Sequence, residues 1–311
     1  MNAAIDTGRV RGRVLRDEPM ARHTSWRVGG PADRYFEPAD RADLLAFIAS
    51  LADDEPLHWV GLGSNLLVRD GGLRGTVIAL HGALDTLVLE AATDADPESR
   101  TVFAEAGVHC ARLAKFTERE GLAGLGFMAG IPGTVGGALA MNAGAWGGET
   151  WPAVEAAEVV LRGGGTRWLT RNAVDYGYRH VALPEAALGF IAARFAVSAD
   201  ADGSQAAAVR TQLARRKATQ PVGRPSAGST FRNPPGDFAA RLIEAAGLKG
   251  YRIGGAGISE QHANFILTET GARAADVEAL IGHVQRTVAE RTGIRLEAEV
   301  RVVGEPDGGA A

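Results

Sequence analysis

The stretch that decides the fold is 121–149, which reads GLAGLGFMAGIPGTVGGALAMNAGAWGGE. Glycine is about 1 kcal/mol less favourable than alanine inside a helix, so this density of glycine needs a reason. The centre of the stretch, 130–138, reads GIPGTVGGA. There Pro132 fixes a backbone angle, and Thr134 is placed to begin a short helix whose free N–H groups could bind an anion. Tight helix packing through small residues is the competing interpretation.

A second glycine loop, GLGSN at 61–65, lies between two short apolar runs. Its two glycines lack a Cβ atom, so main-chain N–H groups can converge on an anion, and its serine and asparagine add side-chain donors. An ordinary β-turn is the alternative. Two phosphate-binding loops in one domain suit a diphosphate, and therefore a dinucleotide. The sequence contains no P-loop, HExxH, EF-hand, GxSxG or Rossmann fingerprint, which removes the commonest nucleotide-binding and hydrolase classes.

The composition is that of an ordinary globular protein. At about 150 residues per domain, 311 residues predict about two domains. The formal charge is 33 − 37 = −4 without a basic stripe, so nucleic acid is not expected as a partner. The single cysteine, Cys110, excludes an intramolecular disulfide. No apolar run approaches the ~20 residues of a membrane span, and the N-terminus lacks an apolar leader, so we expect a cytoplasmic protein without membrane insertion.

Apolar periodicity and turn residues predict an α+β chain of short elements. The expected helices are at 40–51, 109–120, 204–220, 237–246 and 273–291. Ser204 is a plausible N-cap, and Gly247 and Gly293 should end the last two helices. Strands are expected at 76–80 and 101–104, with a final alternating strand at 294–302. Segment 94–99 reads as a hairpin loop.

A third constellation is PSAGSTFRNP at 225–234. Ser229 has no adjacent pattern of histidine and acid that would make it a nucleophile. Its hydroxyl could still donate a proton in a desolvated pocket, whereas a turn serine is the simpler interpretation.

Several blocks in order resemble the UDP-N-acetylenolpyruvoylglucosamine reductase family, flavoenzymes of peptidoglycan precursor synthesis. The resemblance runs from His23 to Gly304 and is similar to the family's shorter, second type. The blocks are HTSWRVGGPAD at 23–33, GLGSNLLV at 61–68, GIPGTVGGALAMNAGAWGG at 130–148, Tyr178-Arg179, AGSTFRNP at 227–234, GGAGISEQHANFI at 254–266 and LEAEVR at 296–301.

The resemblance implies a two-part FAD-binding domain of the vanillyl-alcohol-oxidase type, followed by a smaller α+β substrate domain. The FAD-binding domain would span 23–199, with subdomains at about 23–85 and 86–199, and the substrate domain would span 200–304. Residues 1–22 would be an N-terminal segment, and 305–311 a disordered tail. The resemblance also implies noncovalent FAD, NADPH as co-substrate, a UDP-sugar enolpyruvate as substrate, no metal and a monomer.

The resemblance further implies roles for individual residues. Arg179 would pair with the substrate carboxylate, Glu299 would be the acid beside it, and Ser229 would protonate carbon. Lys217 and Asn233 would bind the UDP moiety. The FAD contacts would be Gly61, Gly63, Ser64, Asn65, Gly130, Pro132, Gly133, Thr134, Gly137, Asn142 and Gly144.

These residues also have alternative interpretations. Glu297 and Glu299 share one polar face, and spacing cannot choose between them. Lys217 could be a solvated helix end, and Arg179 a surface arginine. Trp146 stands where the family usually has tyrosine, and Thr268 where asparagine is common. Two other functions compete: a flavin oxidase of the same superfamily, and a nucleotide-binding protein without catalysis. Many such oxidases tether FAD through histidine or cysteine.

Overall fold

The computed structural model describes residues 10–90 and 100–308, which form two compact units. Of the described residues, unit 1 contains 10–15, 35–61, 76–90 and 100–214. Unit 2 contains 16–34, 62–75 and 215–308. Each unit therefore draws on segments that are far apart in the sequence. The domains expected at 23–199 and 200–304 were continuous stretches, and those boundaries stay a prediction.

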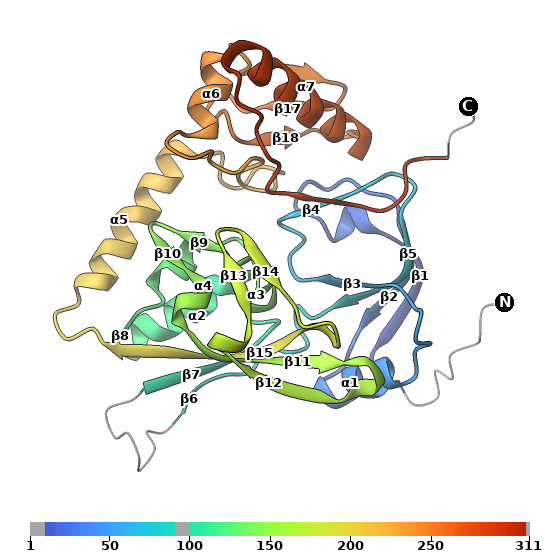
Figure 1. Ribbon diagram of the computed structural model, residues 1–311, viewed down its shortest axis with the longest axis vertical. Helices are drawn as coiled ribbons and strands as arrows, with labels where there is room; N and C mark the ends of the chain where they lie inside the picture. The colour runs from blue at the N-terminus through green and yellow to red at the C-terminus, as the bar shows by residue number, and fades with distance from the viewer. Residues whose placement is uncertain (1–9, 91–99, 309–311) are drawn as a thin grey trace. The chain divides into compact units, whose positions relative to one another are not determined.

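The elements are short, as the glycine-rich sequence suggests (Figure 1). The helices are α1 (Arg41–Ala49), α2 (Cys110–Arg119), α3 (Val135–Met141), α4 (Thr150–Ala153), α5 (Ser204–Thr219), α6 (Ala239–Ala245) and α7 (Ala274–Thr292). The strands of the first part are β1 (Arg13–Pro19), β2 (Pro31–Glu37), β3 (Leu57–Val60), β4 (Leu66–Val68), β5 (Leu73–Ala79), β6 (Leu87–Glu90), β7 (Arg100–Glu105), β8 (Leu122–Ala123), β9 (Gly144–Ala145) and β10 (Gly148–Glu149). They are followed by β11 (Val154–Leu161), β12 (Thr166–Thr170), β13 (Asp175–Gly177), β14 (His180–Ala182), β15 (Ala187–Ala199), β16 (Arg252–Ile253), β17 (Ala256–Ile258), β18 (Ile266–Thr268) and β19 (Arg301–Val303).

Unit 1 is built on an antiparallel sheet in the order β12-β11-β15-β7-β6, with β8 also paired to β15. Its core joins Leu113 of α2 and Leu139 of α3 to Phe195 of β15. A second cluster lies around α1, where the Phe36 and Phe47 rings stack with centroids 3.9 Å apart. In the order β1-β2-β5-β3, β3 and β5 run parallel. This scaffold carries the long glycine stretch between α2 and β11.

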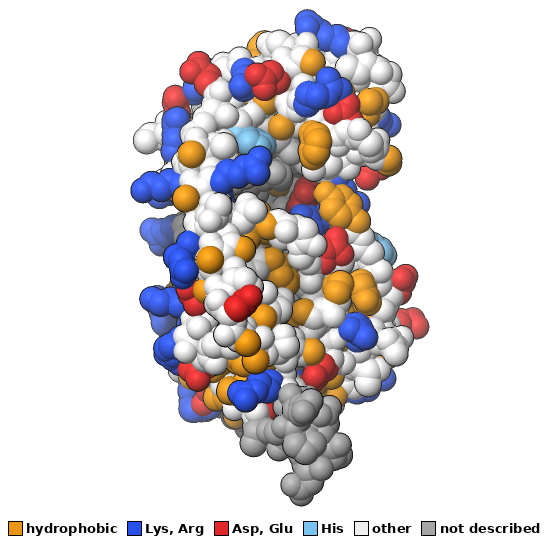
Figure 2. Space-filling view, turned by 90° about the vertical axis from the view of Figure 1, so that its left-hand side faces the viewer, with side chains coloured by type: hydrophobic (Ala, Val, Ile, Leu, Met, Phe, Trp, Pro, Cys, Tyr) orange, Lys and Arg blue, Asp and Glu red, His pale blue; other side chains and the backbone are white. Residues whose placement is uncertain are grey.

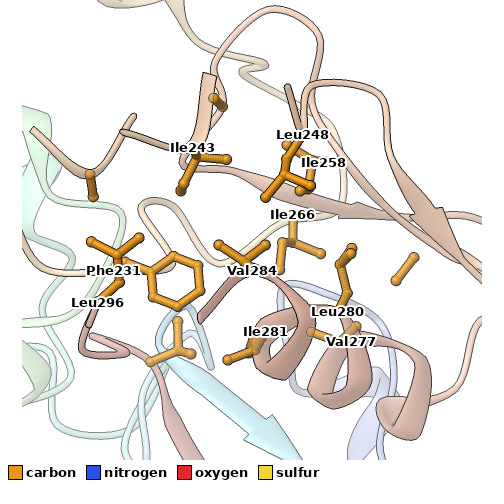
Figure 3. Close-up of a cluster of buried hydrophobic side chains, with 14 of the residues drawn as sticks. Phe231, Ile243, Leu248, Ile258, Ile266, Val277, Leu280, Ile281, Val284 and Leu296 are labelled. Carbon is orange, nitrogen blue, oxygen red and sulfur yellow. The ribbon is translucent and has the colours of Figure 1, made fainter. Parts of the chain in front are cut away.

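Unit 2 packs α6 and α7 with the small antiparallel sheet β16-β17-β18. Figure 3 shows apolar side chains of α7, such as Val284, directed toward Phe231 and Ile243. Trp26, from the N-terminal part of the chain, belongs to the same core and donates from Nε1 to the carbonyl oxygen of Ile266 at 2.8 Å. Burial of such side chains contributes roughly 1.5–3 kcal/mol each, so this distant segment is an integral part of unit 2.

Another distant contact begins helix α7. The Asp70 carboxylate accepts hydrogen bonds from the backbone N–H groups of Ala274 and Ala275, at 2.9 and 3.0 Å. These are N–H groups of the first helical turn, which have no partner within a helix. Asp70, which follows the first glycine loop in the sequence, therefore caps α7.

The predicted α+β class is confirmed, and α1, α2, α6 and α7 lie where periodicity placed helices. Gly247 and Gly293 have φ of 69° and 74° at the ends of α6 and α7, as expected of C-terminal glycines. Helix α5 also forms, but Ser204 is its first residue. Its opening N–H groups are bound by other residues: the Asp200 carboxylate accepts from the second and third residues of α5, at 3.3 and 3.2 Å.

Three other local predictions need correction or lie outside the description. The final strand covers only Arg301–Val303, which pairs in parallel with β4, so the prediction for 294–300 is wrong. The tail is ordered at Glu305, whose backbone exchanges hydrogen bonds with Gly71 and Gly72. The hairpin loop predicted at 94–99 falls within 91–99, outside the described residues.

Charged side chains of both signs lie on the face that Figure 2 displays. Figure 2 shows many Lys and Arg side chains along one edge of the face displayed, with Asp and Glu side chains among them. Among the residues described, no helix combines the length and apolar character needed to cross a membrane.

Candidate functional site

The second glycine loop uses part of its predicted anion-binding capacity within the fold. The backbone N–H groups of Val135 and Gly136, at the start of α3, donate to the carbonyls of Val108 and Ala106, both at 2.8 Å. Thr134 is the N-cap residue but makes no side-chain capping bond. These two contacts use the N–H groups of the first two residues of α3 and leave that of the third, Gly137. The start of α3 therefore has fewer N–H groups available for an anion than the sequence suggested.

The start of the first loop meets the second loop inside unit 1. A Cβ atom on Gly61 would lie 2.3 Å from the Thr134 hydroxyl oxygen, closer than any real contact. Glycine at 61 is therefore required for β3 to end against Thr134. Gly61 and Thr134, one from each of the two predicted phosphate-binding segments, are therefore in direct contact within unit 1, and their role in binding FAD stays a prediction.

Asn142 has a structural role that the sequence did not reveal. It is fully buried, and its φ of 43° is unusual for a residue other than glycine. Its Nδ2 donates to the Glu149 carboxylate at 3.0 Å and to the Gly177 carbonyl at 2.9 Å. Its Oδ1 accepts from the Trp151 N–H at 2.9 Å. The side-chain amide of this predicted FAD contact is thus engaged within the loop.

Arg179 is anchored on the same loop. Its guanidinium donates to the carbonyl oxygens of Asn142 and Gly144, at 3.3 and 3.0 Å, and lies 5.0 Å from the centroid of the Tyr178 ring. A Cβ atom on Gly144 would lie 2.3 Å from the Gly148 carbonyl oxygen and 3.3 Å from Nη1 of Arg179. Unit 1 therefore holds a cation at the end of the glycine stretch, where the sequence predicted both a carboxylate partner and FAD contacts.

Trp146 lies in the tight turn between β9 and β10. Trp146 and Gly147 both have positive φ, 55° and 87°, which is the signature of a type I′ hairpin turn. A Cβ atom on Gly130 would lie 3.0 Å from the Trp146 ring. The indole of Trp146 is therefore packed closely against the second glycine loop.

In unit 2, the first glycine loop is held by two distant segments. Gly63 has a φ of 59°, and its carbonyl accepts from the Ser25 N–H at 3.2 Å. Asn65 donates from Nδ2 to the Glu299 carbonyl at 3.2 Å and accepts from the Arg301 N–H at 3.0 Å. Asn65, predicted as an FAD contact, is thus also a neighbour of the predicted acid.

The backbone segment that carries Ser229 is paired with the segment that carries Glu299, although 70 positions separate the two residues. The Glu299 N–H donates at 2.8 Å to the carbonyl of Thr230, the residue after Ser229. On its other side, the Thr230 N–H donates to the Asn264 carbonyl at 2.8 Å. The Asn264 side chain accepts from the Phe231 N–H and donates to the Phe231 carbonyl, at 2.9 and 2.8 Å. The serine segment is therefore fixed on both edges.

The two glutamates left open by the sequence differ in their surroundings. The Glu297 side chain is 77% exposed and lies 3.8 Å from Arg232, a distance typical of a weak surface ion pair. Glu299 is half-buried. The more shielded environment favours Glu299 as the acid in the proposal below.

The predicted substrate ligands also lie in unit 2. Lys217 is exposed in the last turn of α5, so the interpretation as a solvated helix end stays open. Its neighbour Arg216 is half-buried and donates to the Gln220 side chain at 3.1 Å. Asn233 is exposed, and its Oδ1 accepts from the Ala239 N–H at the start of α6, at 3.1 Å.

Three features add to the residues to which the sequence analysis assigned individual roles. Asn264 bridges the serine segment, as described above. His262 has a buried Nδ1 without a hydrogen bond, and burial lowers the pKa of its imidazole. A cavity of about 410 Å³ in unit 1 is lined by His81, Gly82, Asp85, Gly107, His109, Ala111 and Arg112. Apolar periodicity gives no signal for any of them, because each depends on partners distant in the sequence.

Cys110, the only cysteine, is sealed in the core of unit 1. Its side chain is fully buried, and burial raises the pKa of the thiol to about 12. A thiol in this state is unreactive, because the thiolate is the nucleophile. The buried thiol is therefore poorly suited to attach a flavin covalently.

Comparisons with known proteins cover nearly the whole sequence. Residues 32–170 match the FAD binding domain family, and residues 220–303 match the C-terminal domain of UDP-N-acetylenolpyruvoylglucosamine reductase. The reductase of that name from Alkalilimnicola ehrlichii is 55% identical over 94% of this chain and 96% of its own. The one from Methylococcus capsulatus is 52% identical over 98% and 97%. The crystal structure of the Thermus caldophilus enzyme matches with a TM-score of 0.76 at 33% identity, covering 94% of this chain and 98% of the other.

These matches extend over both units and include the two glycine loops, the serine segment and Glu299. They confirm the predicted family, the FAD-binding domain and the enzymatic character of the protein. The chain belongs to the UDP-N-acetylenolpyruvoylglucosamine reductase family of FAD-dependent oxidoreductases.

Proposed function

We propose that the protein reduces the enolpyruvyl ether of UDP-N-acetylglucosamine to UDP-N-acetylmuramate with NADPH. Bound FAD would supply the redox chemistry, namely hydride transfer from NADPH to the terminal vinyl carbon of the substrate. Overall, the double bond gains one hydride and one proton while NADPH becomes NADP⁺. The proposal rests on the backbone hydrogen bond between Glu299 and Thr230. This bond holds the segment that carries the Ser229 hydroxyl next to the segment that carries the Glu299 carboxyl group.

Arg179 is proposed to bind the substrate carboxylate. Hydride addition places negative charge on the neighbouring carbon, and this charge spreads into the carboxylate. A guanidinium stays protonated and matches the geometry of that anion. Because the carbonyls of Asn142 and Gly144 already orient the guanidinium, little reorganisation is needed when the charge develops.

Ser229 is proposed to donate the proton to carbon, with Glu299 beside it. A serine hydroxyl is a weak acid in water and acts only where its proton acceptor and its hydrogen-bond network are held in place. The two hydrogen-bonded edges of Thr230 supply that rigidity. Glu299 is proposed to polarise the carboxylate or to position the proton.

The remaining roles are also proposals. The proposed phosphate contacts of FAD come from the glycine segments around Gly61, Gly63, Gly133 and Gly137. Lys217 and the exposed amide of Asn233 are proposed to bind the UDP moiety, since a cation and N–H donors both suit phosphate oxygens.

The test is steady-state oxidation of NADPH by the FAD-loaded enzyme, with and without the enolpyruvyl sugar nucleotide. We expect oxidation that depends on the sugar nucleotide. Ser229→Ala should still let NADPH bleach the flavin, but the substrate should no longer reoxidise it. Ser226→Ala is the matched control, because the Ser226 hydroxyl bonds only locally, to the Arg224 carbonyl. NADPH oxidation that ignores the sugar nucleotide would refute the function, and normal turnover of Ser229→Ala would refute the proton donor.

A further inference from the structure

Phe238 is the most exposed of the large apolar side chains in the described part of the chain. It is 66% exposed, immediately before α6. The next residue, Ala239, is fully buried, and Leu242 and Ile243 of the same helix belong to the core of unit 2. The helix is therefore oriented by its buried face, and this orientation leaves the Phe238 ring in solvent.

The backbone around Phe238 is held rigidly. The Asp237 N–H donates to the Pro234 carbonyl at 3.2 Å, and the Phe238 N–H donates to the Asp237 carboxylate at 2.7 Å. Arg241 forms an ion pair with the same carboxylate. An exposed ring on a rigid loop loses little conformational entropy when a flat ligand stacks on it.

Hydrogen-bond donors lie on the same loop. The Asn233 side chain accepts the Ala239 N–H through Oδ1, which fixes the orientation of the amide. Its NH₂ group is then the part left for a ligand, and it offers donors only. Uracil and phosphate both present acceptor oxygens, whereas the exocyclic amino group of cytosine would oppose these donors.

We propose that Phe238 is a specificity-determining residue whose ring stacks on the uracil base of the UDP substrate, with the Asn233 amide donating to an acceptor oxygen of the same nucleotide. The inference rests on the proposed function for the identity of the nucleotide. Stacking between a base and an aromatic ring accounts for roughly tenfold or more in affinity. The ring makes no contribution to chemistry, so the expected effect is on binding.

The experiment compares Phe238→Ala, Phe238→Leu and Phe238→Trp in the FAD-loaded enzyme, with UDP as the probe in calorimetric titrations. Leucine keeps apolar bulk but has no flat π surface, and tryptophan keeps the surface. We expect UDP binding to weaken about tenfold in the Ala and Leu variants and to stay within about threefold in the Trp variant. Val88→Ala, which shortens another exposed apolar side chain (44%) in unit 1, should leave UDP binding unchanged.

Two further probes isolate the base. Inorganic diphosphate should bind all variants equally. The diphosphate of 5,6-dihydrouridine, whose base is no longer planar and aromatic, should bind the wild type weakly and lose nothing further in Phe238→Ala. The rate at which NADPH bleaches the flavin should be unchanged.

Each contrary result has a definite meaning. Wild-type affinity for UDP in Phe238→Ala, wild-type affinity in Phe238→Leu, or no measurable UDP binding by the wild type would overturn the stacking role. An equal loss for NADPH would identify a general nucleotide platform and also overturn it. If the wild type binds UDP as expected but fails in the turnover assay, the proposed function fails while the stacking role stands.

Discussion

The backbone N–H of Glu299 lies 2.8 Å from the carbonyl oxygen of Thr230, so the proposed acid is a direct backbone neighbour of the segment that carries the proposed proton donor. This bond involves no side chain of either glutamate candidate. Substitutions at 297 and 299 therefore report on side-chain chemistry without breaking the backbone pairing.

Glu299→Gln should lower kcat by about 10²–10³, because an amide can neither carry the proton nor supply the charge of a carboxyl group. Glu297→Gln is the matched control on the same face and should change kcat by less than about twofold, since its side chain is 77% exposed. Stopped-flow separation of flavin reduction and reoxidation locates the defect. A larger loss for Glu297→Gln would reverse the assignment.

Asn142→Asp should unfold more easily by about 2–4 kcal/mol, because a carboxylate would replace the NH₂ group that donates to Glu149 and Gly177. Chemical denaturation at pH 7 measures the loss, and part of the stability should return at acidic pH, where the carboxyl groups are protonated. Asn172→Asp changes an exposed residue and should be neutral. Equal stability of the two variants would show that the buried amide network does not hold the loop.

Gly144→Ala should reduce turnover at least tenfold and lower Tm by several degrees. Its Cβ would lie 2.3 Å from the Gly148 carbonyl oxygen, so the hairpin that carries one of the carbonyl ligands of Arg179 must shift. Gly165→Ala has open space around its Cβ and serves as the control. Thermal melts and kcat/KM measurements on both variants test this prediction. A Gly144→Ala variant with normal kcat/KM would contradict it.

The enzyme should lose stability as the pH falls below about 6.5, the usual pKa of histidine. Burial lowers the pKa of His262 in the folded state, so the unfolded chain takes up a proton that the folded chain resists. The stabilisation is complete above the unfolded pKa and declines as the pH falls toward the folded pKa. Denaturant midpoints between pH 7.5 and 5 should show this slope.

His262→Gln should reduce the fall in stability between pH 7.5 and 5 without abolishing it. His109 contributes to the same slope because its pKa is lowered as well, first by burial and then by His81 and Arg112. His180→Gln, at an exposed position, should leave the slope intact. An unchanged slope in His262→Gln would mean that the imidazole is not the titrating group.

The local signals in the sequence predicted helices well because their causes are local. The apolar stripe of α7 and Gly293 after it are both visible within 20 residues, and the structure confirms both. The alternation at 294–300 was equally clear, yet only Arg301–Val303 forms a strand. A strand needs a partner edge, and β4 offers one only to those residues.

The candidate site likewise combines features with a local cause, which the sequence indicates, and features that depend on partners distant in the sequence. Glycine density located the two loops, because backbone that packs closely requires glycine wherever a Cβ would collide, as at Gly61. The roles of Asp70 as the cap of α7 and of Asn264 as the bridge to Phe231 could not be predicted, since their partners lie 204 and 33 positions away. Asn142 stays a predicted cofactor contact, and its side-chain amide also forms hydrogen bonds with Glu149, Gly177 and Trp151, which the sequence did not indicate.

The sealed position of Cys110 has a practical consequence. Because the natural thiol is fully buried with a pKa of about 12, maleimide reagents should leave the folded protein unlabelled. Any cysteine introduced at the surface then becomes the sole attachment point for a dye or spin label, without first removing the native one. With two introduced cysteines, one in each unit, the distance between the two labels could be measured during turnover.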